Sequence, residues 1–466
     1  MFDDEDDEVN DDFLNADLSL FESFLVSGEI VYLDSDRLEA IIDHYIINGD
    51  FLKACKAAEL GIEKFDYIEI FRLRKAQCLN GLGQFDTALT IANQLEADGN
   101  HSVEILLTKA SIYSQLRDSK NAVKYLESAI SKCDPEDCDE LYMDLAIEYQ
   151  NLGKTNQAIS VLKKAIANNP LNETALYEIA FLYDLSGKYK NAVSYYQEFI
   201  DENPYSFTAW YNLGNAYSKL NDFENALKSY DYAILINANF GPAHFNMGNA
   251  YLSTEKFHKA IEHFQECLKI DGDDTMALCY LGEAHEQLNE LDLAKHYYEQ
   301  ALRLAPTLSE AWLGLGIIED LKDNTKEAIV LIKKAINYDP ENAGIYHVLA
   351  GAMEKIENVE EAKVNYLKSL ELDPSDEDCL HDYIELLMEE SPIDALKVLQ
   401  EFRLENSDNP IAKVLEVNLR WMLGERDIAI KLFADCLQEN SIKAKTIFEI
   451  NPNLLDDQDF INLSND

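Results

Sequence analysis

Apolar and small residues recur along this chain with one long period. The segment "AWYNLGNAYSKLNDFENALKSYDYAI" at 209–234 is followed 34 residues later by "AHFNMGNAYLSTEKFHKAIEHFQECL", which keeps the apolar and small positions and changes most of the polar ones. Each segment has two amphipathic halves joined by a short polar stretch. This pattern predicts a repeating pair of helices whose shared positions serve packing.

Each half of the repeat has its own apolar face. In the first half, Trp210, Leu213 and Tyr217 stand at i, i+3 and i+7, which places them on one side of a helix. In the second half, Ala226 and Tyr230 stand at i and i+4, so that small and large residues meet across the pair. One pair cannot cover its own apolar face, but stacked copies can.

Alanine marks the period along nearly the whole chain. It occurs at positions 54, 88, 122, 158, 192, 226, 260, 294, 328, 362, 395 and 429, and nine of the eleven gaps are 34 residues. Pro170, Pro204, Pro306, Pro340 and Pro374 fall twelve residues after one of these alanines, and Gly49, Gly83, Gly153, Gly187, Gly424, Asn221 and Asn289 fall five before one. Glycine and asparagine favour the left-handed cap of a helix, and proline ends the next one. Each repeat is therefore predicted to be helix, capped turn, helix and proline stop.

The pattern W-x2-L-G-x2-Y, followed by Ala, an aromatic residue, Ala and Pro, resembles the tetratricopeptide repeat (TPR), whose period is 34 residues. The matching residues include Trp210, Leu213, Gly214, Tyr217, Ala226, Tyr230 and Ala233, and also Trp312, Leu315, Gly316, Ala328, Ala335 and Pro340. The resemblance implies an all-α, right-handed TPR solenoid, a superhelix of about twelve helix-turn-helix repeats. In overall plan the chain resembles bacterial cytosolic TPR proteins.

The strength of the repeat pattern divides the chain into segments. Residues 1–36 hold thirteen acidic residues and no basic one. The expected segments are a disordered acidic tail (1–16), an N-terminal capping segment (17–34), degenerate repeats (35–138), seven regular repeats (139–376), degenerate repeats (377–440), and a C-terminal capping helix and tail (441–466).

Composition narrows the classes of partner. A net charge of −48 argues against nucleic acid and against anionic membrane surfaces, and leaves basic or neutral proteins and peptides. The N-terminus is acidic, no apolar run approaches 18 residues, and the eight cysteines are scattered without a CxxC pair. These features predict a cytoplasmic protein with buried free thiols. The oligomeric state stays open.

No pattern indicates catalysis. The chain contains no GxxxxGK[ST], GxGxxG, HExxH or GxSxG sequence, and its nine histidines are dispersed. We therefore predict a protein that is not an enzyme and that has no cofactor and no metal site.

Variable residues on the first helix of each repeat are the candidate binding surface. In TPR arrays that this chain resembles, places 2, 5, 9, 12 and 13 of that helix line the concave face. Here they give an apolar-aromatic stretch of Tyr177, Phe181, Tyr211, Phe245 and Leu252 beside Asn215 and Asn249, and an acidic stretch of Glu283, Glu286, Asp320 and Glu354. Aromatic rings would anchor apolar side chains, amides would hold a peptide backbone, and acids would take Lys or Arg. Alternatively, the array buries the aromatic residues, and the asparagines satisfy helix backbones.

The predicted function is a non-enzymatic adaptor or scaffold that binds a peptide or protein segment in the concave groove. One alternative is an acidic holdase or nucleic-acid mimic that binds basic proteins by charge alone. Another is a self-assembling structural array. Binding that survives moderate salt would favour the groove, because interactions of exposed charges are screened.

Overall fold

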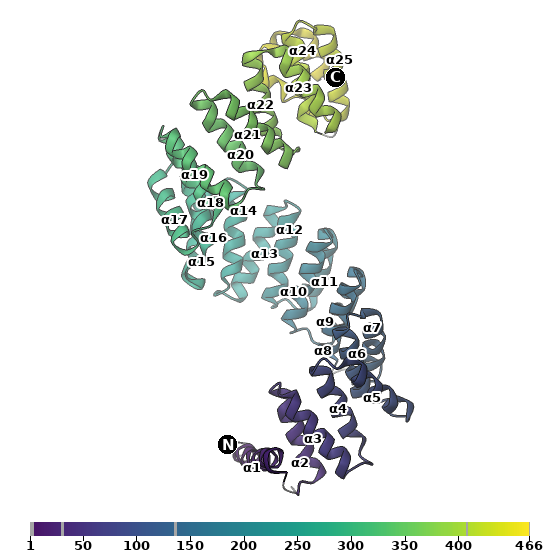
Figure 1. Ribbon diagram of the computed structural model, residues 1–466. Coiled ribbons are helices and arrows are strands. Elements are labelled where there is room, and N and C mark those ends of the chain that lie inside the picture. The colour runs from purple at the N-terminus through teal and green to yellow at the C-terminus, as the bar shows by residue number, and fades with distance from the viewer. Residues whose placement is uncertain (1–3, 29–31, 135–137, 407–408, 466) are drawn as a thin grey trace. The chain divides into compact units, whose positions relative to one another are not determined.

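A computed structural model describes residues 4–28, 32–134, 138–406 and 409–465. Within these residues every regular element is a helix, and no strand occurs. The chain divides into two compact units, Met1–Asn237 and Ala238–Asp466. Each unit is a run of helices in which each helix packs against the next (Figure 1).

Each unit contains six helix pairs in the described residues. The pairs of the first unit are α2 (Ser35–Ile47) with α3 (Phe51–Lys64), α4 (Glu69–Gly81) with α5 (Phe85–Ala97), α6 (Val103–Gln115) with α7 (Ser119–Ile130), α8 (Asp139–Asn151) with α9 (Thr155–Asn168), α10 (Glu173–Leu185) with α11 (Tyr189–Glu202), and α12 (Phe207–Lys219) with α13 (Phe223–Ile236). The pairs of the second are α14 (Gly241–Leu252) with α15 (Phe257–Asp271), α16 (Thr275–Gln287) with α17 (Leu291–Leu304), α18 (Ser309–Leu321) with α19 (Thr325–Tyr338), α20 (Ala343–Lys355) with α21 (Val359–Leu372), α22 (Glu377–Glu390) with α23 (Pro392–Glu405), and α24 (Pro410–Met422) with α25 (Arg426–Glu439). The all-α repeat architecture predicted from the sequence is confirmed.

The phased alanines form the contact between the two helices of each pair. All twelve are at most 3% exposed. On the facing helix, a β-carbon built on Gly214 would lie 2.4 Å from the ring of Tyr230, and one on Gly282 would lie 2.7 Å from the ring of Tyr298. Gly314 of the following repeat meets the same Tyr298 ring. Small residues therefore let helices and large rings approach closely, as the repeat pattern predicts.

The turn within each pair uses the left-handed backbone region. The seven predicted glycines and asparagines have φ between 58° and 80°. Arg117, Glu255, Asp323 and Glu357 occupy the same place in their repeats with φ between 56° and 62°. This conformation costs an ordinary L-residue about 1–2 kcal/mol, so the stacking of the two helices imposes it on these four residues.

Replacing Asp323 or Glu357 with glycine is expected to stabilise its repeat by about 0.5–1 kcal/mol. Glycine adopts this φ without steric cost, and its greater freedom in the unfolded chain cancels part of the gain. Thermal unfolding followed by circular dichroism measures the change. Asp323→Ala is the control, because it keeps the β-carbon and so should bring no increase in Tm; an equal rise in both variants would contradict the explanation.

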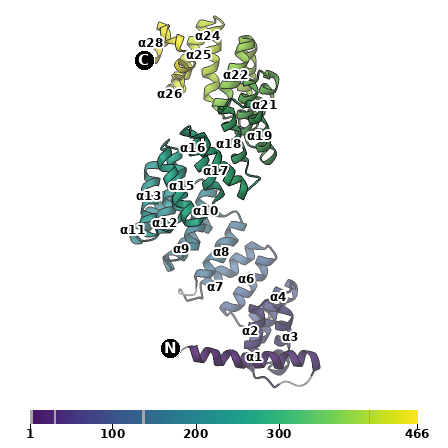
Figure 2. The same ribbon diagram turned by 90° about the vertical axis from the view of Figure 1, so that its left-hand side faces the viewer.

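The N-terminal acidic segment differs from its prediction. Helix α1 runs over Asp4–Ser27, so the described part of the predicted disordered tail is helical. Leu14, Leu18 and Phe21 pack on the first helix pairs. Arg37 donates to Asp17 at 2.6 Å and ties α1 to α2. Figure 2 shows α1 lying crosswise to α2.

The C-terminal segment also differs from the single capping helix that we expected. It forms α26 (Ser441–Ala444), α27 (Ile447–Ile450), the 3-10 helix η2 (Pro452–Asp456) and α28 (Gln458–Asn465). Pro452 interrupts any continuous helix. The side chains of Ile447, Leu454 and Phe460 are fully buried, and the Phe460 ring lies 5.0 Å from that of Phe433 on α25. These short helices therefore cover the core of the last repeat.

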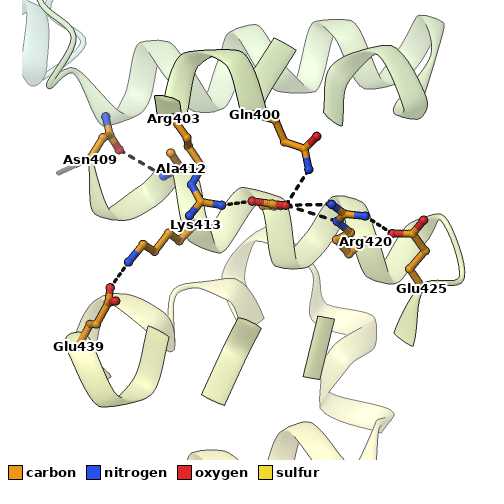
Figure 3. A network of polar contacts seen from close by, with 9 residues as sticks. Gln400, Arg403, Asn409, Ala412, Lys413, Arg420, Glu425 and Glu439 are labelled. Carbon is orange, nitrogen blue, oxygen red and sulfur yellow. Dashed lines mark hydrogen bonds and ion pairs between the residues drawn. The ribbon is translucent and has the colours of Figure 1, made fainter. Parts of the chain in front are cut away.

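A buried charge network joins α23 and α24. Glu416 is 5% exposed, and its carboxylate accepts hydrogen bonds from Arg403, Arg420 and Gln400. Arg420 in turn pairs with Glu425 (Figure 3). The Glu416 carboxylate thus contacts two partly buried arginines, one of which also pairs with Glu425.

The cysteines are free thiols, and six of the eight are buried. Burial raises the pKa of Cys78, Cys267, Cys279 and Cys379 to about 12, which keeps these thiols protonated at neutral pH. In the described residues no helix is both long enough and apolar enough to span a membrane.

Candidate functional site

The predicted apolar-aromatic stretch divides between the two units. Tyr177 and Phe181 lie on α10 of the first unit, where they are 39% and 56% exposed. Their neighbours Leu176 and Ile179 are buried, so the helix turns one face inward and presents these two rings outward. Ile147 on α8 is 51% exposed at the place that corresponds to Phe181. The first unit therefore offers exposed apolar side chains on its first helices.

Tyr211 and Asn215, on α12, are both partly engaged within the first unit. The Tyr211 ring is half-buried, with its centroid 6.0 Å from that of Tyr230. The Tyr230 hydroxyl donates to Asn215 Oδ1 at 2.8 Å. Asn215 thus satisfies the hydroxyl of a buried tyrosine, and not a helix backbone as in the alternative considered for the asparagines.

A cleft of about 670 Å³ opens in the second unit. Its lining comes from α14, α16, the turn between α14 and α15, and the first residue of α15. It consists of Asn249, Leu252, Ser253, Glu255, Phe257, Tyr280, Glu283 and Gln287. Three residues predicted from the sequence, Asn249, Leu252 and Glu283, therefore surround one space. The cleft combines two amides, one aliphatic side chain, two aromatic rings and two carboxylates.

Phe245 supports this cleft from below and is not part of its lining. Its ring centroid lies 5.8 Å from that of Phe264 and 5.7 Å from that of Tyr280. Phe264 is fully buried in the core of the same repeat. The ring of Phe245 thus packs in the layer that holds Tyr280 in place, and its predicted role as a direct anchor stays a prediction.

Glu283 has an unusual electrostatic environment. Burial raises the pKa of its carboxyl group, and its charge in turn helps to raise the pKa of the neighbouring Glu286. In the described part of the chain its carboxylate has neither a hydrogen bond nor an ion pair. A carboxylate that is partly removed from water without a partner is costly, and a bound cation would remove that cost.

The other predicted acids are already engaged. The Tyr298 hydroxyl donates to Glu286 at 3.0 Å, and burial raises the pKa of Glu286 to about 7. Asp320 accepts from Lys355 and from Thr325, and Glu354 accepts from the hydroxyl of Tyr366 at 3.0 Å. The acidic stretch is therefore not a continuous free surface, and Glu283 is its one member without a partner in the described residues.

Sequence reasoning missed five residues of the cleft lining: Ser253, Glu255, Phe257, Tyr280 and Gln287. Gln287 occupies place 13 of its repeat, which the family resemblance had already marked as concave. Tyr280 occupies place 6, between the packing positions and the variable ones. Gln287 could therefore have been predicted from its place in the repeat, whereas Tyr280 could be identified as part of the cleft only from the three-dimensional structure.

Sequence models of the tetratricopeptide repeat match residues 103–131, 143–207, 207–240, 241–274, 276–308 and 343–376. Among curated proteins, the chain is similar to the signal recognition particle subunit SRP72 of Dictyostelium discoideum, with 27% identity over 176 residues that cover 31% of this chain and 25% of SRP72. The chain thus matches about a quarter of the length of this relative. The matched repeats fall on helix pairs between α6 and α21.

Several solved structures are similar. The Cut9–Hcn1 hetero-tetramer of APC/C matches with 14% identity and a TM-score of 0.45, over 89% of this chain and 94% of that one. A tetratricopeptide repeat protein from Parabacteroides merdae matches with 17% identity and a TM-score of 0.45, over 54% and 98%. YrrB, described as a TPR protein with an unusual peptide-binding site, matches with 24% identity and a TM-score of 0.31, over 40% and 96%.

Proposed function

Because the chain belongs to the tetratricopeptide repeat proteins, we propose that it is an interaction adaptor whose cleft between α14 and α16 holds a peptide segment carrying a lysine or arginine. Tetratricopeptide repeats imply a protein-interaction adaptor or scaffold, and such proteins are generally not enzymes. The observation that carries the finer proposal is the desolvated, unpartnered carboxylate of Glu283. A cationic side chain beside it would form the hydrogen bonds that the protein itself does not supply.

The rest of the cleft lining suits an extended peptide. Asn249 and Gln287 each carry both a donor and an acceptor, as a peptide backbone requires. Leu252 and Tyr280 offer apolar contact to a side chain next to the basic one. The net charge of −48 would in addition speed the encounter with a basic segment.

Tyr177 and Phe181 are proposed as a second contact surface, for an apolar part of the same partner or of another. The observation that supports this proposal is the exposure of both rings to solvent. Large exposed rings on a repeat surface cost solvation free energy unless a partner covers them. We propose that Tyr211 lies next to this contact surface. Asn215, Phe245, Glu286 and Asp320 are proposed to act by positioning other residues, because each of them already contacts a residue of its own unit.

Glu283→Gln is expected to weaken binding of a lysine- or arginine-containing peptide by about 10- to 100-fold, which corresponds to about 1.5–3 kcal/mol for a hydrogen bond to a charged group. Peptides would be selected from a random library on the full chain at moderate salt, and their affinities measured by calorimetry. Glutamine keeps the shape of the side chain, so helicity and Tm should stay close to those of the native chain.

The matched control is Glu262→Gln on α15, which makes the same change of charge at an exposed position outside the cleft. It should leave the affinity unchanged. Equal losses in the two variants, together with affinity that disappears in moderate salt, would instead favour the acidic holdase. Selection of peptides without basic residues would reject the proposed role of Glu283. Concentration-dependent size of the free chain would favour self-assembly.

A further inference from the structure

We propose that His347, Asp376 and Cys379 form a zinc-binding site between α20 and α22 of the second unit. One donor atom from each of the three residues lies within 4.8 Å of the other two. The set offers one nitrogen, one oxygen and one sulfur, which are the atoms that Zn²⁺ takes from proteins. This inference departs from the sequence analysis, which predicts no metal site, and it does not depend on the proposed peptide cleft.

Backbone hydrogen bonds to Oδ1 hold the Asp376 carboxylate in place, and its Oδ2 faces His347. It is the N-cap of α22, where its Oδ1 accepts from the backbone N–H groups of Asp378 at 3.1 Å and Cys379 at 3.0 Å. Its Oδ2 lies 3.7 Å from Nδ1 of His347. The cap therefore orients the carboxylate, and the second oxygen points to the position a cation would take.

His347 is oriented by a second carboxylate. Its Nε2 lies 2.8 Å from Oδ2 of Asp382, which follows Asp376 by six residues on α22. Histidines that bind metal usually donate their other ring N–H to a carboxylate, which fixes the tautomer and turns the free nitrogen to the ion. With Nε2 held by Asp382, Nδ1 is the nitrogen that faces Asp376 and is available as a ligand.

Cys379 closes the site from the protein interior. Its side chain is fully buried, whereas the side chains of His347 and Asp376 are each 23% exposed. An ion would thus enter from the solvent side and reach the sulfur last. Zinc binds cysteine as the thiolate, so the cation would displace the thiol proton on binding.

The distances fit zinc after a small contraction. Ligands at 2.0–2.3 Å from a tetrahedral ion stand roughly 3.3–3.6 Å apart. The observed Nδ1–Oδ2 distance of 3.7 Å is already close to this value. One donor atom of each of the three residues lies within 4.8 Å of the other two. Three protein ligands leave a fourth position for water, as in open zinc sites.

A second group of donors lies nearby and has to be distinguished. His381, Asp382 and Glu385 also bring one donor atom each within 4.8 Å. Asp382 in this group already contacts both histidines, at 2.8 Å and 3.5 Å, and Glu385 is exposed. This group contains no sulfur, so a thiolate signature separates the two sites.

The test is titration of the full chain, without a metal-binding tag, with Zn²⁺ by calorimetry and with Co²⁺ by absorption spectroscopy. One equivalent is expected to bind and to raise Tm. Bound cobalt should show the near-ultraviolet absorption of a thiolate ligand. Cys379→Ala should abolish that absorption, His347→Ala should abolish binding, and Asp382→Asn should weaken it by about 10- to 100-fold.

Cys279→Ala is the control for loss of another buried thiol, and it should leave the cobalt spectrum unchanged. Circular dichroism of every variant establishes that the repeats remain folded. The proposal is overturned if no equivalent binds, if the cobalt spectrum lacks the thiolate absorption, or if His381→Ala removes binding while Cys379→Ala does not. The last result would assign the ion to the second group.

Discussion

Replacing Glu416 with alanine is expected to destabilise the repeats from α22 to α25 by about 3–5 kcal/mol, the cost of removing one partner from a buried ion pair. Its carboxylate is 5% exposed and accepts from two arginines and a glutamine. Without it, Arg403 and Arg420 keep their charges in a region with little water. Arg420 retains Glu425, but Arg403 has no second carboxylate in the described residues.

Hydrogen exchange followed by mass spectrometry is the suitable measurement, because an array of repeats need not unfold in one step. Protection should fall in α23, α24 and α25 and stay unchanged in the first unit. Glu439→Ala is the matched control: it removes an exposed acid that pairs with Lys413, and its cost should stay within about 1 kcal/mol. Adding Arg403→Met to Glu416→Ala should recover part of the loss. Equal protection in the two single variants would contradict the importance of the buried network.

Glu286→Gln is expected to stabilise the second unit at pH 8 by up to about 3 kcal/mol and to leave its stability unchanged near pH 4.5. Burial raises the pKa of Glu286 from 4.5 to about 7, so the folded state binds this proton more tightly than the unfolded state does. The contribution of the side chain to stability is therefore fully present below about pH 4.5 and is lost as the pH rises to about 7. Glutamine is neutral throughout and can still accept from the Tyr298 hydroxyl.

Tm of both proteins would be followed from pH 4.5 to 8, and the difference between them plotted. Carboxyl groups that do not interact with Glu286 titrate alike in the two chains and cancel in that difference; Glu283, whose charge helps to raise the pKa of Glu286, is the exception. The difference should grow between pH 4.5 and 7 and then become constant. A difference independent of pH, or one that grows toward acid, would show that burial does not control this carboxyl group.

The packing skeleton could be predicted from sequence because it depends on residue size at fixed places. The alanines such as Ala226 and Ala294 are all buried, and Gly214 does face a ring. The turns at Asp323 and Glu357 could not be recognised from residue type. There the stacked helices dictate the backbone, against the preference of the residue that occupies it.

The binding surface was harder to predict, because a polar side chain has several partners within reach. The hydroxyl of Tyr230 donates to Asn215 at place 9, whereas that of Tyr298 donates to Glu286 at place 12. In the repeat between them the ring is Phe264, which has no hydroxyl. A residue at the same place is thus engaged in one repeat and free in the next, and only side-chain geometry distinguishes the two cases.

The buried cysteines can report local unfolding of individual repeats. Cys78 and Cys138 lie in the first unit, and Cys267, Cys279, Cys379 and Cys436 lie in the second. A covered thiol does not react with an alkylating reagent until its repeat separates from a neighbour. The alkylation rate at each site therefore reports how often that repeat opens, with no substitution in the chain. Comparing these six rates would show where the array comes apart first.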